Sequence, residues 1–154
     1  MSEASGQVLE HVLAGTPVPP VVRGRRAAVL SAVQDCYEAL LEVDGSALLG
    51  RRERHAVALQ VAADSGCAPL ARWFADVLDE LGDEPESPVA RVLAEAASTL
   101  ARDPAAGGAV FASVAAALPP ADLVAFAELV SFTCYLSRVV TALLVLDETR
   151  QDAR

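Results

Sequence analysis

The chain has 154 residues and a formal net charge of −9, because 21 acidic residues outnumber 12 basic ones, all of them arginine. An acidic protein repels phosphate groups, which argues against nucleic acid and anionic membranes as partners. Hydrophobic residues make up 53% of the sequence but aromatic residues only 5%, so alanine, valine and leucine must build the core. Alanine and leucine favour helices, whereas strands prefer β-branched and aromatic residues.

Apolar residues recur at helical spacing along the whole chain, and no alternating pattern typical of strands interrupts them. From the amino terminus onward, we predict helices at residues 7–14, from 23 or 25 to 41, and at 50–64, 68–81, 88–102, 105–117 and 120–146. An acidic loop at 82–88 joins two helical blocks. The length fits one domain over residues 1–154. The sequence therefore predicts a single all-α domain of about six or seven helices.

The last predicted helix is the longest, and it is apolar enough to raise the question of a membrane span. Glu128 and Arg138 argue against a span, since a charge near the bilayer centre costs about 2.5–3.5 kcal/mol. Apolar residues cover more than the ~100° stripe that packing against the chain's own core requires. We therefore expect a homo-oligomer, most simply a dimer, held together by this helix and the helix at 50–64.

The chain has three cysteines, Cys36, Cys67 and Cys134. Their odd number and wide spacing do not fit a disulfide framework and suit a reducing compartment. Residues 1–6 lack the basic and apolar regions of a signal peptide. We expect a cytoplasmic protein.

The segment from Glu53 to Cys67 follows the pattern E-R-x-x-V-A-L-x-V-A-x-x-x-G-C. This pattern resembles the run that leads into a redox Cys-x-x-Cys in carboxymuconolactone decarboxylase (CMD)-like and alkylhydroperoxidase-D-like (AhpD-like) proteins. Residues 8–17, 36–41 and 122–143 are similar to a branch of CMD-domain proteins, so the resemblance covers most of the chain. It implies an AhpD-like helical bundle with a long C-terminal helix and assembly through its helices.

Peroxidases of that superfamily use both cysteines of the Cys-x-x-Cys, together with a glutamate and histidines that relay protons. By the resemblance Cys67 matches the first cysteine, but Leu70 occupies the place of the second. Pro69 and Phe74 lie where histidines would be expected, and His55 lies where the glutamate would be. Because a resolving sulfur must lie close to the first, we predict that hydroperoxide reduction by an internal dithiol cycle does not occur.

Two functions stay open. The first is a non-redox AhpD-like protein that acts through assembly or by binding a small apolar ligand. The second is a divergent enzyme whose catalytic residues are Cys67 and His55, acting as a one-cysteine thiol peroxidase or in acid–base chemistry. Cys67 lies at a predicted helix start, a setting that can activate a thiol. His55 precedes it by twelve residues, and antiparallel packing could bring the two together as a nucleophilic pair.

Other kinds of site find little support in the sequence. No histidine, cysteine or carboxylate cluster has metal-ligand spacing, and no glycine-rich phosphate loop is present. We therefore expect neither metal nor cofactor. Two arginine clusters fall at predicted helix starts, where the helix dipole disfavours cations. Salt bridges to the many carboxylates explain them better than an anion site does; the clusters are Arg23, Arg25, Arg26 and Arg51, Arg52, Arg54.

Overall fold

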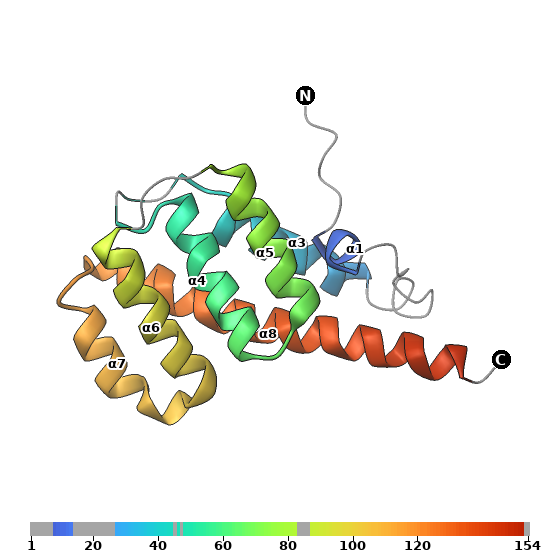
Figure 1. The fold of residues 1–154 in the computed structure, drawn as a ribbon. Coiled ribbons are helices and arrows are strands. Elements are labelled where there is room, and N and C mark those ends of the chain that lie inside the picture. Colours follow the sequence, from blue (N-terminus) through green and yellow to red (C-terminus); the bar gives the residue numbers. More distant parts are fainter. Residues whose placement is uncertain (1–7, 14–26, 45, 47, 83–86, 153–154) are drawn as a thin grey trace.

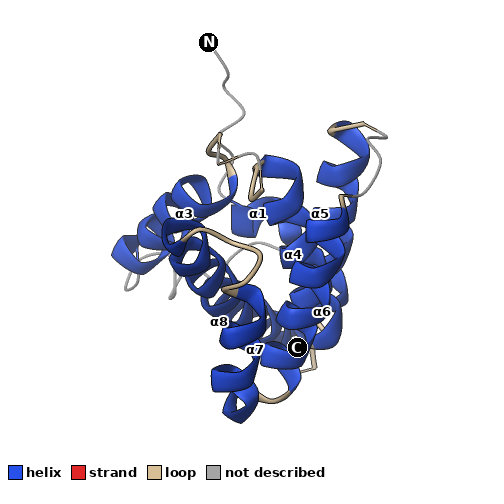
Figure 2. Ribbon diagram, turned by 90° about the vertical axis from the view of Figure 1, so that its left-hand side faces the viewer, coloured by secondary structure: helices blue, strands red, loops and turns tan. Residues whose placement is uncertain are grey.

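A computed structural model describes residues 8–13, 27–44, 46, 48–82 and 87–152. These residues form an all-α bundle with a long last helix, as the sequence predicts, and no strand occurs among them (Figures 1 and 2). The helices, labelled as in Figure 1, are α1 (Val8–Val12), α3 (Ala27–Leu41), α4 (Arg51–Asp64), α5 (Ala68–Glu80), α6 (Pro88–Arg102), α7 (Gly107–Val114) and α8 (Pro120–Gln151).

Most predicted boundaries lie within a few residues of the observed ones. The predicted helix at 105–117 begins as a 3-10 turn, Pro104–Ala106, and continues as the shorter α7. The last helix continues five residues beyond the predicted end at 146. Ser87 caps α6 by accepting a hydrogen bond from the backbone N–H of Ala90 at 3.0 Å, and Pro88 occupies the first turn. Residues 23–26, with the first arginine cluster, and residues 83–86 of the acidic loop lie outside the described residues.

The turn between α4 and α5 fixes the position of Cys67. Gly66 adopts a left-handed conformation, with φ of 70°, which glycine tolerates without a steric penalty. Its N–H donates to Ala63 O at 3.0 Å, and the N–H of Cys67 donates to Ala62 O at 3.0 Å. This pair of hydrogen bonds defines a Schellman motif. Cys67 therefore both completes the end of α4 and precedes α5.

Helix α4 lies at the centre of the bundle and packs against α3, α5, α6 and α8. One hydrophobic cluster takes residues from every described α-helix. Alanines contribute to it at sites such as Ala58 and Ala62, whose small side chains let neighbouring helices approach closely. The two valines of α4, Val57 and Val61, are wholly buried within the chain, whereas Leu59 is only partly buried. The expectation that this helix helps to hold a homo-oligomer together stays a prediction.

Helix α8 runs along the bundle beside α3, α4 and α6, and its C-terminal end extends past the other helices (Figure 1). By length and composition, it is the one helix among the described residues that could cross a membrane, over Pro120–Thr149. Its buried side carries Phe126, Leu129, Leu136 and Val140, while Val145 and Leu146 near its end are exposed. The helix thus contributes side chains to the core along much of its length, and it exposes Val145 and Leu146 near its C-terminus.

Candidate functional site

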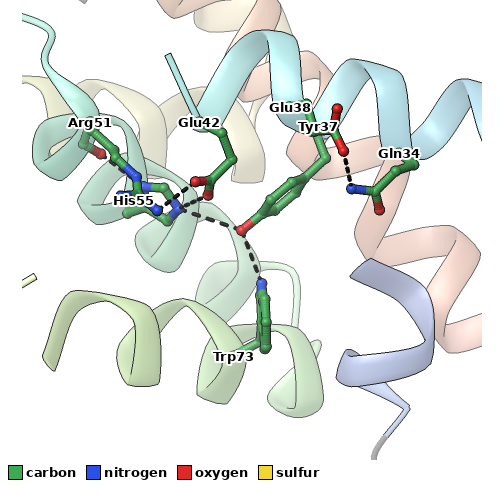
Figure 3. A network of polar contacts seen from close by, with 7 residues as sticks. All are labelled: Gln34, Tyr37, Glu38, Glu42, Arg51, His55 and Trp73. Atoms are coloured by element: carbon green, nitrogen blue, oxygen red, sulfur yellow. Dashed lines mark hydrogen bonds and ion pairs between the residues drawn. The ribbon is translucent and has the colours of Figure 1, made fainter. Parts of the chain in front are cut away.

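A partly buried polar network connects the end of α3 with the start of α4 and the middle of α5 (Figure 3). Tyr37 comes from the last turns of α3, and Glu42 follows directly after that helix. Arg51 and His55 lie one helical turn apart at the start of α4, and Trp73 extends from α5. In a bundle held together mainly by aliphatic side chains, this is the cluster of described residues with the most varied chemistry.

His55 is wholly buried at the centre of the network. Its Nδ1 lies 2.8 Å from the backbone oxygen of Arg51. Because a carbonyl only accepts hydrogen bonds, Nδ1 carries the proton and Nε2 presents its lone pair in the neutral ring. Burial lowers the pKa of His55 below its ordinary value of 6.5, against the smaller upward effects of the Arg51 carbonyl and Glu42. The ring is therefore neutral at pH 7.

Two groups face the Nε2 atom of His55. The hydroxyl of Tyr37 lies 3.5 Å away, and Oε1 of Glu42 lies 3.4 Å away. The Tyr37 hydroxyl accepts a hydrogen bond from Trp73 Nε1 at 3.2 Å, which leaves its own proton for a neighbour. Burial raises the pKa of Tyr37 above its ordinary value of 10.0, so the phenol stays protonated at neutral pH. The phenol is thus a hydrogen-bond donor beside an imidazole that can accept a proton.

Glu42 links this buried cluster to the surface. Its side chain is 31% exposed, and its Oε2 lies 2.5 Å from Nη2 of the more exposed Arg51. One carboxylate therefore contacts both a surface guanidinium and a buried imidazole. Chemically, the arrangement can pass a proton between solvent and His55 through Glu42, or it can serve only to satisfy buried polar atoms.

Cys67, the predicted nucleophile, lies away from this network. It is only 2% exposed and precedes α5 without capping it through its sulfur. His55 is in the second turn of α4, and the nine residues that follow it before the helix ends span roughly 13 Å. The two residues therefore lie towards opposite ends of α4, and the structure does not bring them together. In place of the thiol, His55 has Tyr37 and Glu42 as partners.

The three residues that sequence reasoning missed are Tyr37, Glu42 and Trp73. Tyr37 fits the apolar spacing of its helix, so the sequence predicts it only as a core residue. One signal was available, because a buried tyrosine hydroxyl needs a hydrogen-bond partner. The sequence does not say that the partners come from two other helices.

The second arginine cluster has three different roles. Arg51 forms the predicted type of ion pair, with Glu42. Arg52 instead donates to the backbone oxygen of Gly82. Arg54 is buried and donates to the backbone oxygens of Leu49, at 2.9 Å, and Leu40, at 2.8 Å. The expectation of salt bridges thus holds for one arginine of this cluster, and the others satisfy backbone carbonyls.

An apolar groove lies between α3 and α8, with a volume of about 310 Å³. The Cys36 thiol and the Tyr135 hydroxyl are the heteroatoms that its lining side chains carry. The lining residues are Ala28, Val29, Ala32, Val33, Cys36, Phe132 and Tyr135. Among the described residues, no group of three or more histidine, cysteine or carboxylate side chains could hold a metal ion.

Comparison with protein-family models, curated proteins and solved structures finds no match to this chain.

Proposed function

We propose that the chain is a non-redox protein of the CMD-like and AhpD-like superfamily that binds a small apolar ligand. The observation that carries this proposal is the burial around Cys67. The thiol is almost inaccessible, and Leu70 and Phe74 are wholly buried. By the resemblance, those two positions hold the second cysteine and a histidine in the redox members. The hydrocarbon side chains of Leu70 and Phe74 can neither form a disulfide with an oxidised Cys67 nor relay a proton.

A ring contact within the bundle supports the resemblance itself. The resemblance places His55 at the position of the proton-relaying glutamate and Phe74 at that of a histidine. The rings of His55 and Phe74 lie 6.1 Å apart with an edge-to-face arrangement. In a redox member, the residues at these two positions would act together. In this chain the corresponding residues, His55 and Phe74, are in contact, which supports a shared architecture with different chemistry.

The groove between α3 and α8 is the binding site that we propose. Ligand sites typically enclose about 300–1,000 Å³ and are mainly apolar with a few polar groups. The groove lies at the lower end of that range, so it suits a small aromatic or aliphatic molecule. The hydroxyl of Tyr135, a half-exposed residue, can provide one hydrogen bond to orient it.

A fluorescent apolar probe tests this assignment. We expect 1-aminoanthracene to bind the wild type with saturable enhancement at one site per chain. Ala32→Arg places a long charged side chain in the groove and should weaken binding by about tenfold or more. Ala39→Arg is the matched control, since Ala39 is also exposed on α3 but does not line the groove. Equal binding by both variants, or no saturable binding by the wild type, would refute the proposal.

The polar network favours one alternative function, acid–base chemistry at His55. Its Nε2 lone pair faces a phenol and a carboxylate that reaches the surface, so a proton could be exchanged with solvent. The version of this alternative that uses Cys67 as a one-cysteine peroxidase needs an external thiol as reductant. We expect no peroxide consumption with dithiothreitol above that of Cys67→Ser. Robust turnover that is lost in both Cys67→Ser and His55→Gln would favour the enzyme.

We further propose a cytoplasmic homo-oligomer. The described cysteines are all free, which suits a reducing compartment. The exposed apolar side chains near the end of α8 provide a surface that a second copy could cover.

A further inference from the structure

A second cavity, of about 480 Å³, lies where the turn after α4 and the end of α6 meet α8. Its residues are Ser65, Ala101, Cys134, Ser137, Arg138, Thr141 and Ala142. The volume is well within the range of small-molecule sites. The apolar groove between α3 and α8 has few polar groups, whereas this cavity is lined by three hydroxyl groups, a thiol and a guanidinium.

The hydroxyl groups of α8 are arranged as acceptors. Ser137 donates its hydroxyl proton to Thr133 O, and Thr141 donates its proton to Ser137 O, both at 2.8 Å. Their oxygen lone pairs are left to accept hydrogen bonds from a ligand. Ser65 lies at the end of α4, where the partial negative charge of a helix C-terminus also favours a positive or donating group.

Arg138 supplies the opposite chemistry. It is exposed and forms no hydrogen bond or ion pair with any other residue that the structure describes, although the chain carries 21 acidic residues. Its charge acts on the neighbouring thiol: burial raises the pKa of Cys134, and Arg138 opposes that rise. A guanidinium with free donors at a cavity wall matches a carboxylate, which it can bind through two parallel hydrogen bonds.

We propose that this cavity binds a small carboxylic acid whose neighbouring carbon carries a hydrogen-bond donor, either an ammonium or a hydroxyl group. The carboxylate pairs with Arg138, and the donor points to the oxygens of Ser137 and Thr141. Ala101 and Ala142 contribute little volume and leave room for a short side chain. This site is separate from the apolar groove, so the inference does not depend on the function proposed above.

Amide proton–nitrogen spectra test the site with L-alanine and L-lactate as probes. We expect one or both probes to shift the amide signals of Ser65 and of residues 137–142. The negative end of the α4 dipole should attract the ammonium group of alanine. Propionate, which lacks the donor, and lactamide, which lacks the carboxylate, should bind at least about tenfold more weakly. Whichever of the two probes binds more tightly identifies the class of acid.

Arg138→Gln should weaken binding about tenfold or more, and Ala142→Phe should block the cavity while leaving the charge in place. Arg72→Gln is the matched control, because Arg72 is an exposed arginine on α5 outside the cavity. If neither probe shifts these amides at about 10 mM, tenfold above a dissociation constant of about 1 mM, the proposal is wrong. It is equally wrong if Arg138→Gln binds as the wild type does.

Discussion

The three cysteines illustrate how strongly a residue's environment decides its chemistry. Cys36 is exposed on α3, Cys134 is partly buried on α8, and Cys67 is almost wholly enclosed at the α4–α5 turn. In a Schellman motif, the residue after the glycine commonly makes an apolar contact with the end of the helix. Cys67 occupies that position, so its burial has a structural explanation that needs no redox role.

We therefore predict an order of reactivity towards N-ethylmaleimide. In the native protein Cys36 should react first and Cys134 more slowly, because burial raises the pKa of the Cys134 thiol and reduces the thiolate fraction. Cys67 should become labelled only when urea unfolds the chain. Mass spectrometry of peptides after timed labelling measures the order. Labelling of native Cys67 as fast as Cys36 would contradict this assignment and favour the thiol-dependent enzyme.

His55 makes the stability of the protein depend on pH. Its pKa in the folded chain is lower than the ordinary 6.5, so below that pH the unfolded chain binds a proton more readily than the folded chain does. The contribution of neutral His55 to the free energy of unfolding is therefore present above about pH 6.5 and is lost as the pH falls through the folded-state pKa.

The corresponding experiment is urea unfolding of wild type and His55→Gln at several pH values between about 7.5 and 5. We expect the stability advantage of the wild type to shrink as the pH falls, since glutamine does not titrate. Arg72→Gln is the control, because Arg72 is exposed on α5 and the variant keeps His55 and its partners, so its curve should run parallel to that of the wild type. A difference between wild type and His55→Gln that stays constant with pH would show that the buried ring does not titrate as we infer.

At the scale of the elements, Arg54 connects α3 to the start of α4. The last carbonyls of a helix have no partner within it, and Leu40 O is one of these in α3. Arg54 donates to it and to Leu49 O, in the loop before α4. The negative end of the α3 dipole also favours the guanidinium. One buried side chain thus satisfies two backbone groups and fixes the approach of consecutive helices.

We predict that Arg54→Leu lowers the free energy of unfolding by about 3 kcal/mol, because it leaves buried carbonyls without donors. Arg54→Lys should recover only part of this loss, since an ammonium lacks the planar fork of donors. Arg72→Leu, at an exposed site of α5, should change stability by no more than about 0.5 kcal/mol. Urea unfolding gives the three values, and an Arg54→Leu variant as stable as the Arg72→Leu control would contradict the role assigned here.

At the scale of the whole molecule, the surface of α8 bears on assembly. Leu136, in the middle of this helix, is wholly buried in the chain's own core, so a charge there would unfold the protomer rather than separate two copies. The exposed Val145 and Leu146 belong to the last two turns of α8, whose C-terminal end extends past the other helices (Figure 1). Val124 and Tyr135 are also exposed on this helix, but Val145 and Leu146 are consecutive, and we propose them as the contact with a second copy.

We predict a solution mass of about twice the 16.0 kDa protomer by light scattering at micromolar concentration. Leu146→Asp should shift the mass towards 16.0 kDa without changing the helical circular dichroism. Val92→Asp introduces the same charge at an exposed apolar site on α6 and should leave the oligomer intact. A wild-type mass near that of the protomer would rule out the proposed assembly.

The helices themselves could be predicted because their signals are local. The Ser65-Gly66 pair ends α4 and Ser87-Pro88 begins α6 through hydrogen bonds to residues within four positions, so the sequence alone indicates both boundaries. The start of α7 was less well predicted. A proline, three alanines and two glycines surround it, and such a composition leaves the choice between a 3-10 turn and an α-helix to packing.

The sequence by itself determined the all-α class and the absence of a second cysteine within a helical turn of Cys67, because both follow from residue type and spacing along the chain. Only the tertiary structure decided which groups surround His55. Its expected partner, Cys67, lies beyond the other end of the same rigid helix, whereas Tyr37 and Glu42 reach it from α3 and the loop after it. Helix packing brings together residues that are far apart in sequence, and their polar contacts depend on the angles between helices, which no local pattern encodes.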